Sequence, residues 1–101
     1  MQLMHNVFFT LKDKSPAAVK QLVDACKKYL TIQPGIVTFA AGARDPGLTR
    51  EVNDLGWDVG LHVLFKDRAS HDAYQDDPTH DKFIEEMKGN WAKVRVFDSM
   101  V

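Results

Sequence analysis

Two segments of the chain alternate between apolar and other side chains with a period of two, which is typical of β-strands. One covers residues 3–11, and the other runs from Trp57 to Phe65 and is the clearest strand pattern in the chain. Side chains at alternating positions are expected on opposite faces of the sheet. The first segment places Leu3, His5, Val7, Phe9 and Leu11 on one face, and the second places Trp57, Val59, Leu61, Val63 and Phe65 on one face. Both faces of the first segment carry apolar residues, so both are expected to be at least partly covered.

Two shorter apolar segments, residues 36–41 and 91–98, are also predicted to be strands. The first follows Pro34-Gly35, a pair of residues that commonly ends a helical region. In the second, the alternation predicts Val94 and Val96 on one face and Trp91, Arg95 and Phe97 on the other.

Apolar residues recur at helical spacing in three other segments. Ser15-Pro16 is a typical helix start, and the apolar positions that follow it extend to about residue 30. Asp67 is expected to cap a helix that ends near Asp76, because Pro78 breaks the pattern. Thr79 is expected to cap a further helix, which stops at Gly89 and buries Phe83, Ile84 and Met87.

This order of elements predicts one α+β domain over residues 1–101, a ferredoxin-like βαββαβ fold with its helices on one face of the sheet. The other face of the sheet would expose a large apolar patch. A homodimer in which two sheets pack together into an α/β barrel would cover it. The polar loop 42–56 is unusually long for a small domain, and such loops often act as lids.

Composition and charge exclude several classes of function. The net charge of −1 provides no basic field for nucleic acid or an anionic membrane surface. No apolar run approaches the roughly 20 residues of a membrane span, and the N-terminus lacks the features of a signal peptide. The single cysteine, Cys26, forms no internal disulfide. We therefore expect a cytoplasmic protein.

The residues that indicate chemistry are Tyr74, His80 and His5. Tyr74 and His80 lie six residues apart across the break at Pro78, and His5 lies in the first strand. If the strand meets this junction, three proton-handling groups line one cavity. His80 would then act as a general base, and Tyr74 would stabilise an enolate through its hydroxyl. The structural alternative is that both residues only stabilise the helix junction.

Other candidate sites are weaker. The four histidines include no i, i+4 pair of the kind that binds zinc on a helix, and the acidic residues form no calcium loop. No cofactor and no metal ligand is predicted. We expect His62 to face away from Val59, where a role in a dimer interface fits it, and His71 to be solvated on a polar helix. Cys26 is expected to pack in the core.

The chain resembles the stress-responsive dimeric α/β-barrel family, Dabb, over nearly its whole length. The family implies a ferredoxin-like protomer and a barrel-forming dimer, but no single activity. Some relatives bind a divalent ion near the dimer seam, so a loose metal site stays open. The residues that carry the resemblance are 5–12, Pro34-Gly35, Gly42, 57–65, Tyr74, 77–80, Phe83 and 96–98.

One family member, the plant enzyme olivetolic acid cyclase, closes a linear polyketide by an aldol condensation. Its proposed acid/base pair matches Tyr74 and His80, and a histidine in its first strand matches His5. Two other pocket residues of that enzyme, a histidine and a tyrosine, correspond to Val59 and Cys26 here. The resemblance thus implies the acid/base pair but not the polyketide substrate.

Three hypotheses about function follow. The first is a dimeric barrel that binds a hydrophobic or carbonyl-containing small molecule and acts on it by cofactor-free acid/base chemistry, as a cyclase or isomerase does. The second is a non-enzymatic, stress-associated or structural dimer. The third is a monooxygenase-like barrel, since related families with this architecture include monooxygenases.

Overall fold

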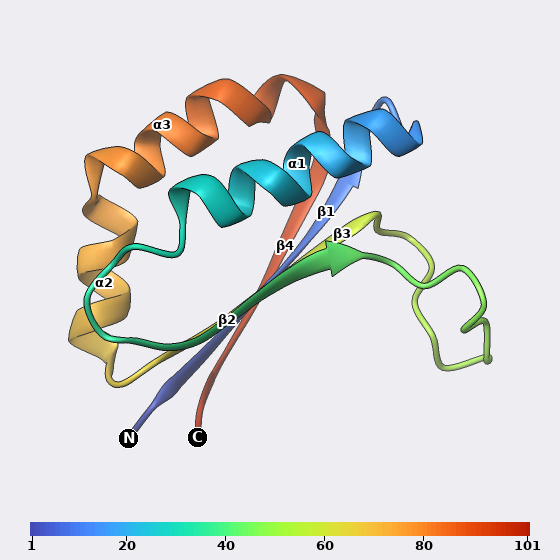
Figure 1. Ribbon diagram of the computed structural model, residues 1–101. Coiled ribbons are helices and arrows are strands. Elements are labelled where there is room, and N and C mark those ends of the chain that lie inside the picture. The colour runs from blue at the N-terminus through green and yellow to red at the C-terminus, as the bar shows by residue number, and fades with distance from the viewer.

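The computed structural model describes residues 1–101 and consists of one four-stranded antiparallel sheet and three α-helices. The helices all lie on one face of the sheet (Figure 1). This arrangement confirms the predicted ferredoxin-like βαββαβ fold. The strands are β1 (Leu3–Leu11), β2 (Ile36–Ala43), β3 (Val59–Phe65) and β4 (Trp91–Met100), and the helices are α1 (Pro16–Tyr29), α2 (Arg68–Asp76) and α3 (Pro78–Met87).

The order of strands across the sheet is β2-β3-β1-β4, so β1 lies in the interior and β4 at one edge. β1 pairs with β3 on one side and with β4 on the other over almost its whole length. Its odd-numbered residues are buried and its even-numbered residues are half-buried, which confirms the predicted alternation and the partial cover of both faces. His5 is therefore held beneath the helices, with only 4% of its surface exposed.

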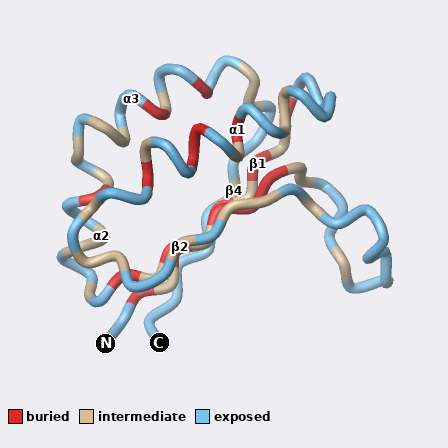
Figure 2. Tube along the Cα trace, viewed as in Figure 1, coloured by how far each residue is buried: buried red, intermediate tan, exposed pale blue.

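The hydrophobic core fills the space between the helices and the sheet, where the buried positions gather in Figure 2. β3 contributes four completely buried or nearly buried side chains, and α1 contributes Leu22 and Cys26. The Ser15 side chain accepts a hydrogen bond from the backbone N–H of Ala18 and so caps α1 as expected. No helix combines the length and the apolar character needed to cross a bilayer.

The junction between α2 and α3 is built differently from the prediction. Asp77, not Thr79, caps α3: a carboxylate oxygen of Asp77 accepts a hydrogen bond from the backbone N–H of Thr79 at 2.7 Å. The backbone of Asp77 is extended, and Pro78 occupies the first helical position, where its missing N–H costs nothing. The chain thus turns sharply between α2 and α3, which brings Tyr74 and His80 together.

Two tryptophans lie on the opposite face of the sheet from the one predicted. At the junction of Thr10 and Leu11 the pairing of β1 with β4 shifts by one residue, so Ala92 has no partner and Trp91 lies on the helix side of the sheet. Trp57 precedes β3 and packs edge-to-face against Phe8 on the other side, with ring centroids 4.9 Å apart. Strict alternation fails at both positions because each lies at an irregular strand end.

The connection between β2 and β3, residues 44–58, extends beyond the end of the sheet (Figure 1). It is anchored there, since Asp58 accepts hydrogen bonds from the Leu11 backbone and from Lys14. None of its residues lines the apolar cavity between the sheet and the helices, which is described below. The structure therefore gives no support to a lid function for this loop.

Candidate functional site

An apolar cavity of about 120 Å³ lies between the sheet and the helices. It borders the α2–α3 junction and β4, and its exposed wall residues Val94 and Val96 place its opening at this edge strand. Ten of its thirteen lining residues are hydrophobic, so the few polar groups stand out. The lining residues are His5, Val7, Phe9, Leu30, Leu61, Tyr74, Gln75, His80, Phe83, Ile84, Trp91, Val94 and Val96.

Tyr74 is completely buried, and its hydroxyl has no hydrogen-bond partner in the protein. Burial of the ring raises the pKa of Tyr74 above its ordinary value, because the phenolate would lose its hydration. The side chain therefore keeps its proton at neutral pH and offers an O–H donor. A buried donor without a partner costs roughly 1–3 kcal/mol, so a ligand oxygen that accepts this hydrogen bond would recover stability.

His80 lies next to Tyr74, with ring centroids 4.8 Å apart. Its Nδ1 atom is buried and also lacks a hydrogen-bond partner. Burial lowers the pKa of His80 below its ordinary value, although the carboxylates of Asp81 and Asp77 oppose the shift. The imidazole is thus neutral at pH 7, and a neutral imidazole can accept a proton.

His5 is a further polar residue of the cavity wall, beside Tyr74, His80 and Gln75, and its ring centroid is 6.0 Å from that of Tyr74. Its Nδ1 atom is 2.5 Å from a carboxylate oxygen of Asp98, the residue directly opposite it in β4. Burial lowers the pKa of His5, and the hydrogen bond with Asp98 partly offsets this effect. The fold thus brings all three predicted residues to one cavity.

Two residues at this site were not predicted. Asp98, which orients His5, could not be found without the register between β1 and β4. His71 was expected to be solvated, but only 15% of its side chain is exposed, and its ring lies 5.0 Å from that of His5. The spacing could have shown this, because residues three apart on a helix share a face and Tyr74 is buried.

The other histidine and the cysteine lie outside this cavity, as predicted. His62 is on the opposite face of the sheet, where its Nδ1 atom is 2.8 Å from the side-chain oxygen of Asn6. Cys26 is completely buried, and burial raises the pKa of its thiol to about 12. A thiol in that state is a packing group and not a nucleophile at neutral pH.

The comparison with protein families shows to which family the chain belongs. The model of the stress responsive A/B barrel domain, Dabb, matches residues 3–101. The chain belongs to the Dabb family. The resemblance noted from the sequence motifs is thereby confirmed, whereas no curated protein matches the chain.

Solved structures agree with this assignment of the fold. A dimeric ferredoxin-like protein of unknown function from Thermobifida fusca has a TM-score of 0.83 at 24% identity, covering 100% of this chain and 92% of its own. A Dabb family protein from Mesorhizobium loti has a TM-score of 0.81 at 24% identity, with 99% and 96% covered. The hydroxynitrile lyase of Passiflora edulis has a TM-score of 0.78 at 19% identity, with 99% and 93% covered. At these identities the likenesses show the ferredoxin-like fold alone.

Proposed function

We propose that this Dabb protein binds a small carbonyl compound in the apolar cavity and moves a proton at the carbon next to the carbonyl. The observation that carries this proposal is that the Tyr74 hydroxyl and His80 Nδ1 are buried without hydrogen-bond partners on one apolar cavity. The third such atom of the protein, the indole nitrogen of Trp91, belongs to the same cavity wall. Natural proteins pair nearly all buried polar atoms, so each exception needs a physical explanation, of which a catalytic or ligand-binding role is one. A ligand with one oxygen and an acidic C–H would satisfy both Tyr74 and His80.

The proposed step needs no cofactor. Neutral His80 removes a proton from the carbon adjacent to the carbonyl, and the electron pair of the broken C–H bond moves toward the carbonyl oxygen. The Tyr74 hydroxyl donates a hydrogen bond to the resulting enolate oxygen, which the apolar wall shields from water. Return of the proton from His80 to a different carbon completes an isomerisation. In a cyclisation the enolate carbon forms a bond to a second carbonyl carbon, and the oxygen of that carbonyl takes the proton from His80.

The size of the cavity limits the ligand. A cavity of about 150 Å³ is large enough for benzene, so the space beside Tyr74 and His80 suits a group of five or six non-hydrogen atoms. A longer molecule would extend past Val94 and Val96, where the cavity opens. We therefore propose a reacting end of this size, with its carbonyl oxygen toward Tyr74.

Deuterium exchange tests the reaction with a simple probe. Cyclopentanone in D₂O would gain deuterium next to its carbonyl faster with the protein than without it. His80→Gln should lower the protein-dependent rate by roughly 10²–10⁴-fold. His62→Gln, on the other face of the sheet, is the matched control and should leave the rate unchanged.

The outcomes separate catalysis from binding. NMR shifts of Tyr74 and His80 report binding of the probe independently of exchange. Binding without faster exchange would contradict the catalytic proposal and favour the non-enzymatic hypothesis. The monooxygenase-like alternative draws on fold alone, since the putative antibiotic biosynthesis monooxygenase of Chloroflexus aurantiacus is 13% identical to this chain.

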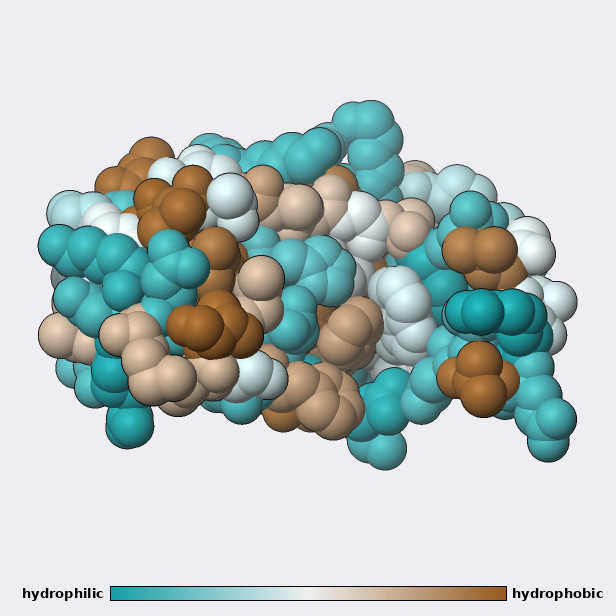
Figure 3. Space-filling view, turned by 90° about the horizontal axis from the view of Figure 1, so that it is seen from below, coloured by the Kyte–Doolittle hydropathy of each residue, from teal (hydrophilic) through white to brown (hydrophobic).

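The partner that we propose is a second copy of this chain. The sheet face away from the helices carries Phe8, Phe97 and the Asn6–His62 pair. Figure 3, viewed from below the sheet, shows apolar residues across this face with hydrophilic ones between them. Phe97 is half exposed on it, and the similar ferredoxin-like protein of Thermobifida fusca is dimeric. Pairing of the two sheets would remove these apolar groups from water.

A further inference from the structure

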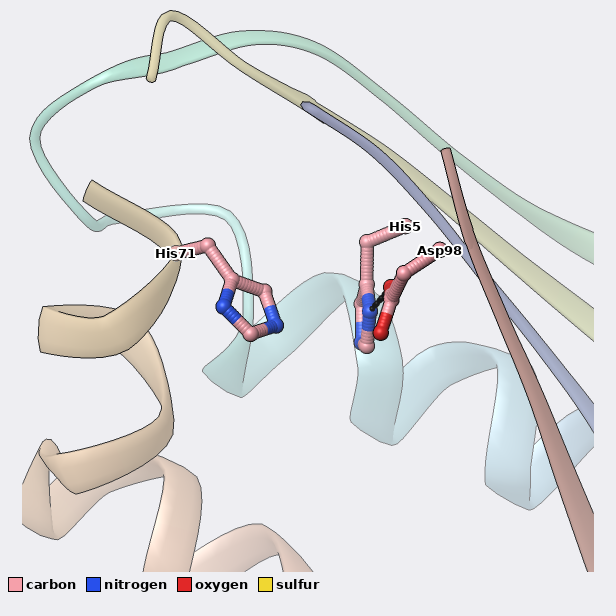
Figure 4. A group of neighbouring side chains, drawn as sticks. All are labelled: His5, His71 and Asp98. Carbon is pink, nitrogen blue, oxygen red and sulfur yellow. Dashed lines mark hydrogen bonds and ion pairs between the residues drawn. The ribbon is translucent and has the colours of Figure 1, made fainter. Parts of the chain in front are cut away.

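Three potential metal ligands meet beside the cavity: the imidazoles of His5 and His71 and the carboxylate of Asp98. One ligand atom from each lies within 4.8 Å of those of the other two. They come from β1, α2 and β4, and Figure 4 shows the His71 ring directed toward His5 and Asp98. Residues from three separate elements thus converge on one point.

The His71 ring is oriented in the way metal-binding histidines usually are. Its Nδ1 atom is 3.0 Å from a carboxylate oxygen of Asp72, and this carboxylate also accepts a hydrogen bond from Arg68 at 3.2 Å. The other ring nitrogen, Nε2, lies on the side toward His5 (Figure 4). A carboxylate on the outer nitrogen of a histidine fixes its tautomer and raises the basicity of the inner nitrogen, as it does around bound metals.

We propose that His5, His71 and Asp98 bind a divalent first-row transition-metal ion, with Zn²⁺ the best match. Two imidazoles and one carboxylate are borderline ligands that favour zinc and its neighbours over Ca²⁺ and Mg²⁺, which prefer oxygen ligands alone. Three protein ligands leave a coordination position for water or a ligand.

The ion has a route to this site. A groove of about 340 Å³ borders the cluster, and its wall includes His71 and Asp98. Asp98 has 40% of its side chain exposed, so its carboxylate faces both water and His5. Arg68 also lines this groove, but its guanidinium is paired with Asp72. The site therefore lies between open solvent and the buried His5.

Binding requires only a small contraction. Nitrogen and oxygen atoms bound to Zn²⁺ at about 2.0–2.2 Å in a tetrahedron lie roughly 3.3 Å from one another. The present cluster, with ligand atoms up to 4.8 Å apart, closes to this size if the His71 ring moves by about 1.5 Å. His71 lies on the short surface helix α2, whereas His5 and Asp98 are held by paired strands.

Metal binding can be measured without the proposed reaction. His5 belongs to both sites, but zinc titration requires no carbonyl compound, and deuterium exchange can be followed in metal-free protein. Failure of one proposal therefore leaves the other open to its own test.

Isothermal titration of tag-free protein with ZnCl₂ tests the site, and the absorption of bound Co²⁺ reports its coordination. We expect one ion per chain. His71→Ala and Asp98→Asn should each weaken binding by at least roughly tenfold, and Asp72→Asn by roughly 10–100-fold, since Asp72 orients His71. His62→Asn, which removes a histidine from the opposite face, should change nothing.

His71 and Asp98 lie outside the hydrophobic core cluster, and 15% and 40% of their side chains are exposed, so His71→Ala and Asp98→Asn are expected to fold. Circular dichroism checks this directly. The proposal is overturned if the wild-type protein binds no ion. It is also overturned if His71→Ala binds zinc as tightly as the wild type. Loss of binding in His62→Asn with retention in Asp98→Asn would assign the ion to the outer face and likewise contradict the proposal.

Discussion

His62 and His80, which lie on opposite sides of the sheet, differ in their hydrogen bonding. On the outer face, His62 is hydrogen-bonded to Asn6 and lies among aromatic rings. On the inner face, His80 lies among apolar side chains with its Nδ1 unpaired, next to an equally unpaired Tyr74 hydroxyl. Burial lowers the pKa of both histidines. A lowered pKa therefore does not distinguish a structural histidine from a candidate base, whereas the missing hydrogen bond does.

The largest expected difference between the faces is in packing. Phe65 is fully buried on the inner face, and its ring lies 5.0 Å from Tyr74 and 5.6 Å from His71. Phe65→Ala should lower the free energy of unfolding by about 3–5 kcal/mol, because it removes apolar contacts and leaves a cavity. Urea denaturation at fixed protein concentration measures the loss.

Phe97→Ala on the outer face is the matched control. In a separate protomer this half-exposed residue should contribute less than about 1 kcal/mol. Its main effect should be on self-association, which sedimentation equilibrium measures, because the proposed dimer covers it. Equal losses of stability from the two substitutions in monomeric protein would contradict the division into a buried face and an open face. Unchanged association would argue against the sheet-to-sheet dimer.

A smaller difference is expected in the response to pH. Because folding lowers the pKa values of His80 and His62 below 6.5, the unfolded chain binds more protons in mildly acidic solution. Stability therefore rises with pH across this window and is lost as the pH falls through 6.5. Thermal unfolding should show a Tm lower by a few degrees at about pH 5.5 than at about pH 7.5.

The two histidines should contribute unequally to this loss. A protonated His62 keeps its hydrogen bond with Asn6, whereas the Nδ1 atom of His80 has no hydrogen-bond partner, and the charges of Asp81 and Asp77 are what stabilise its protonated ring. His80→Gln should thus reduce the pH dependence of Tm more than His62→Gln does. The reverse order would show that His80 has an acceptor in solution.

Much of the fold could be predicted because apolar alternation and helix-cap residues are local signals. The four strands and the helix break at Pro78 follow from the sequence, and only their ends moved. Trp91 and Trp57 were placed on the wrong faces because each lies where the regular pairing ends. The cap at Asp77 was missed because both Asp77 and Thr79 can accept the hydrogen bond, and only the backbone geometry distinguishes them.

The candidate site was predictable only in part. Tyr74, His80 and His5 could be named because their residue types and a family resemblance indicated them. The pairing of Asp98 with His5 depends on the register of two strands that are 93 residues apart in sequence, which no local pattern contains. Whether the Tyr74 hydroxyl and His80 Nδ1 have partners depends on packing in three dimensions.

The smallest expected effect is the most informative about the inner face. Tyr74→Phe removes a buried hydroxyl that has no partner, so the free energy of unfolding should stay constant or rise by up to about 1 kcal/mol. Asn6→Ala on the outer face removes the partner of His62 and should lower it by about 1 kcal/mol. Both differences are measurable by urea denaturation. If Tyr74→Phe were as destabilising as Asn6→Ala, the hydroxyl would be hydrogen-bonded to water in solution. A ligand oxygen would then have to displace that water. The Tyr74 hydroxyl would be bonded to water and His62 to Asn6, but the two hydrogen bonds would contribute similarly to the free energy of unfolding.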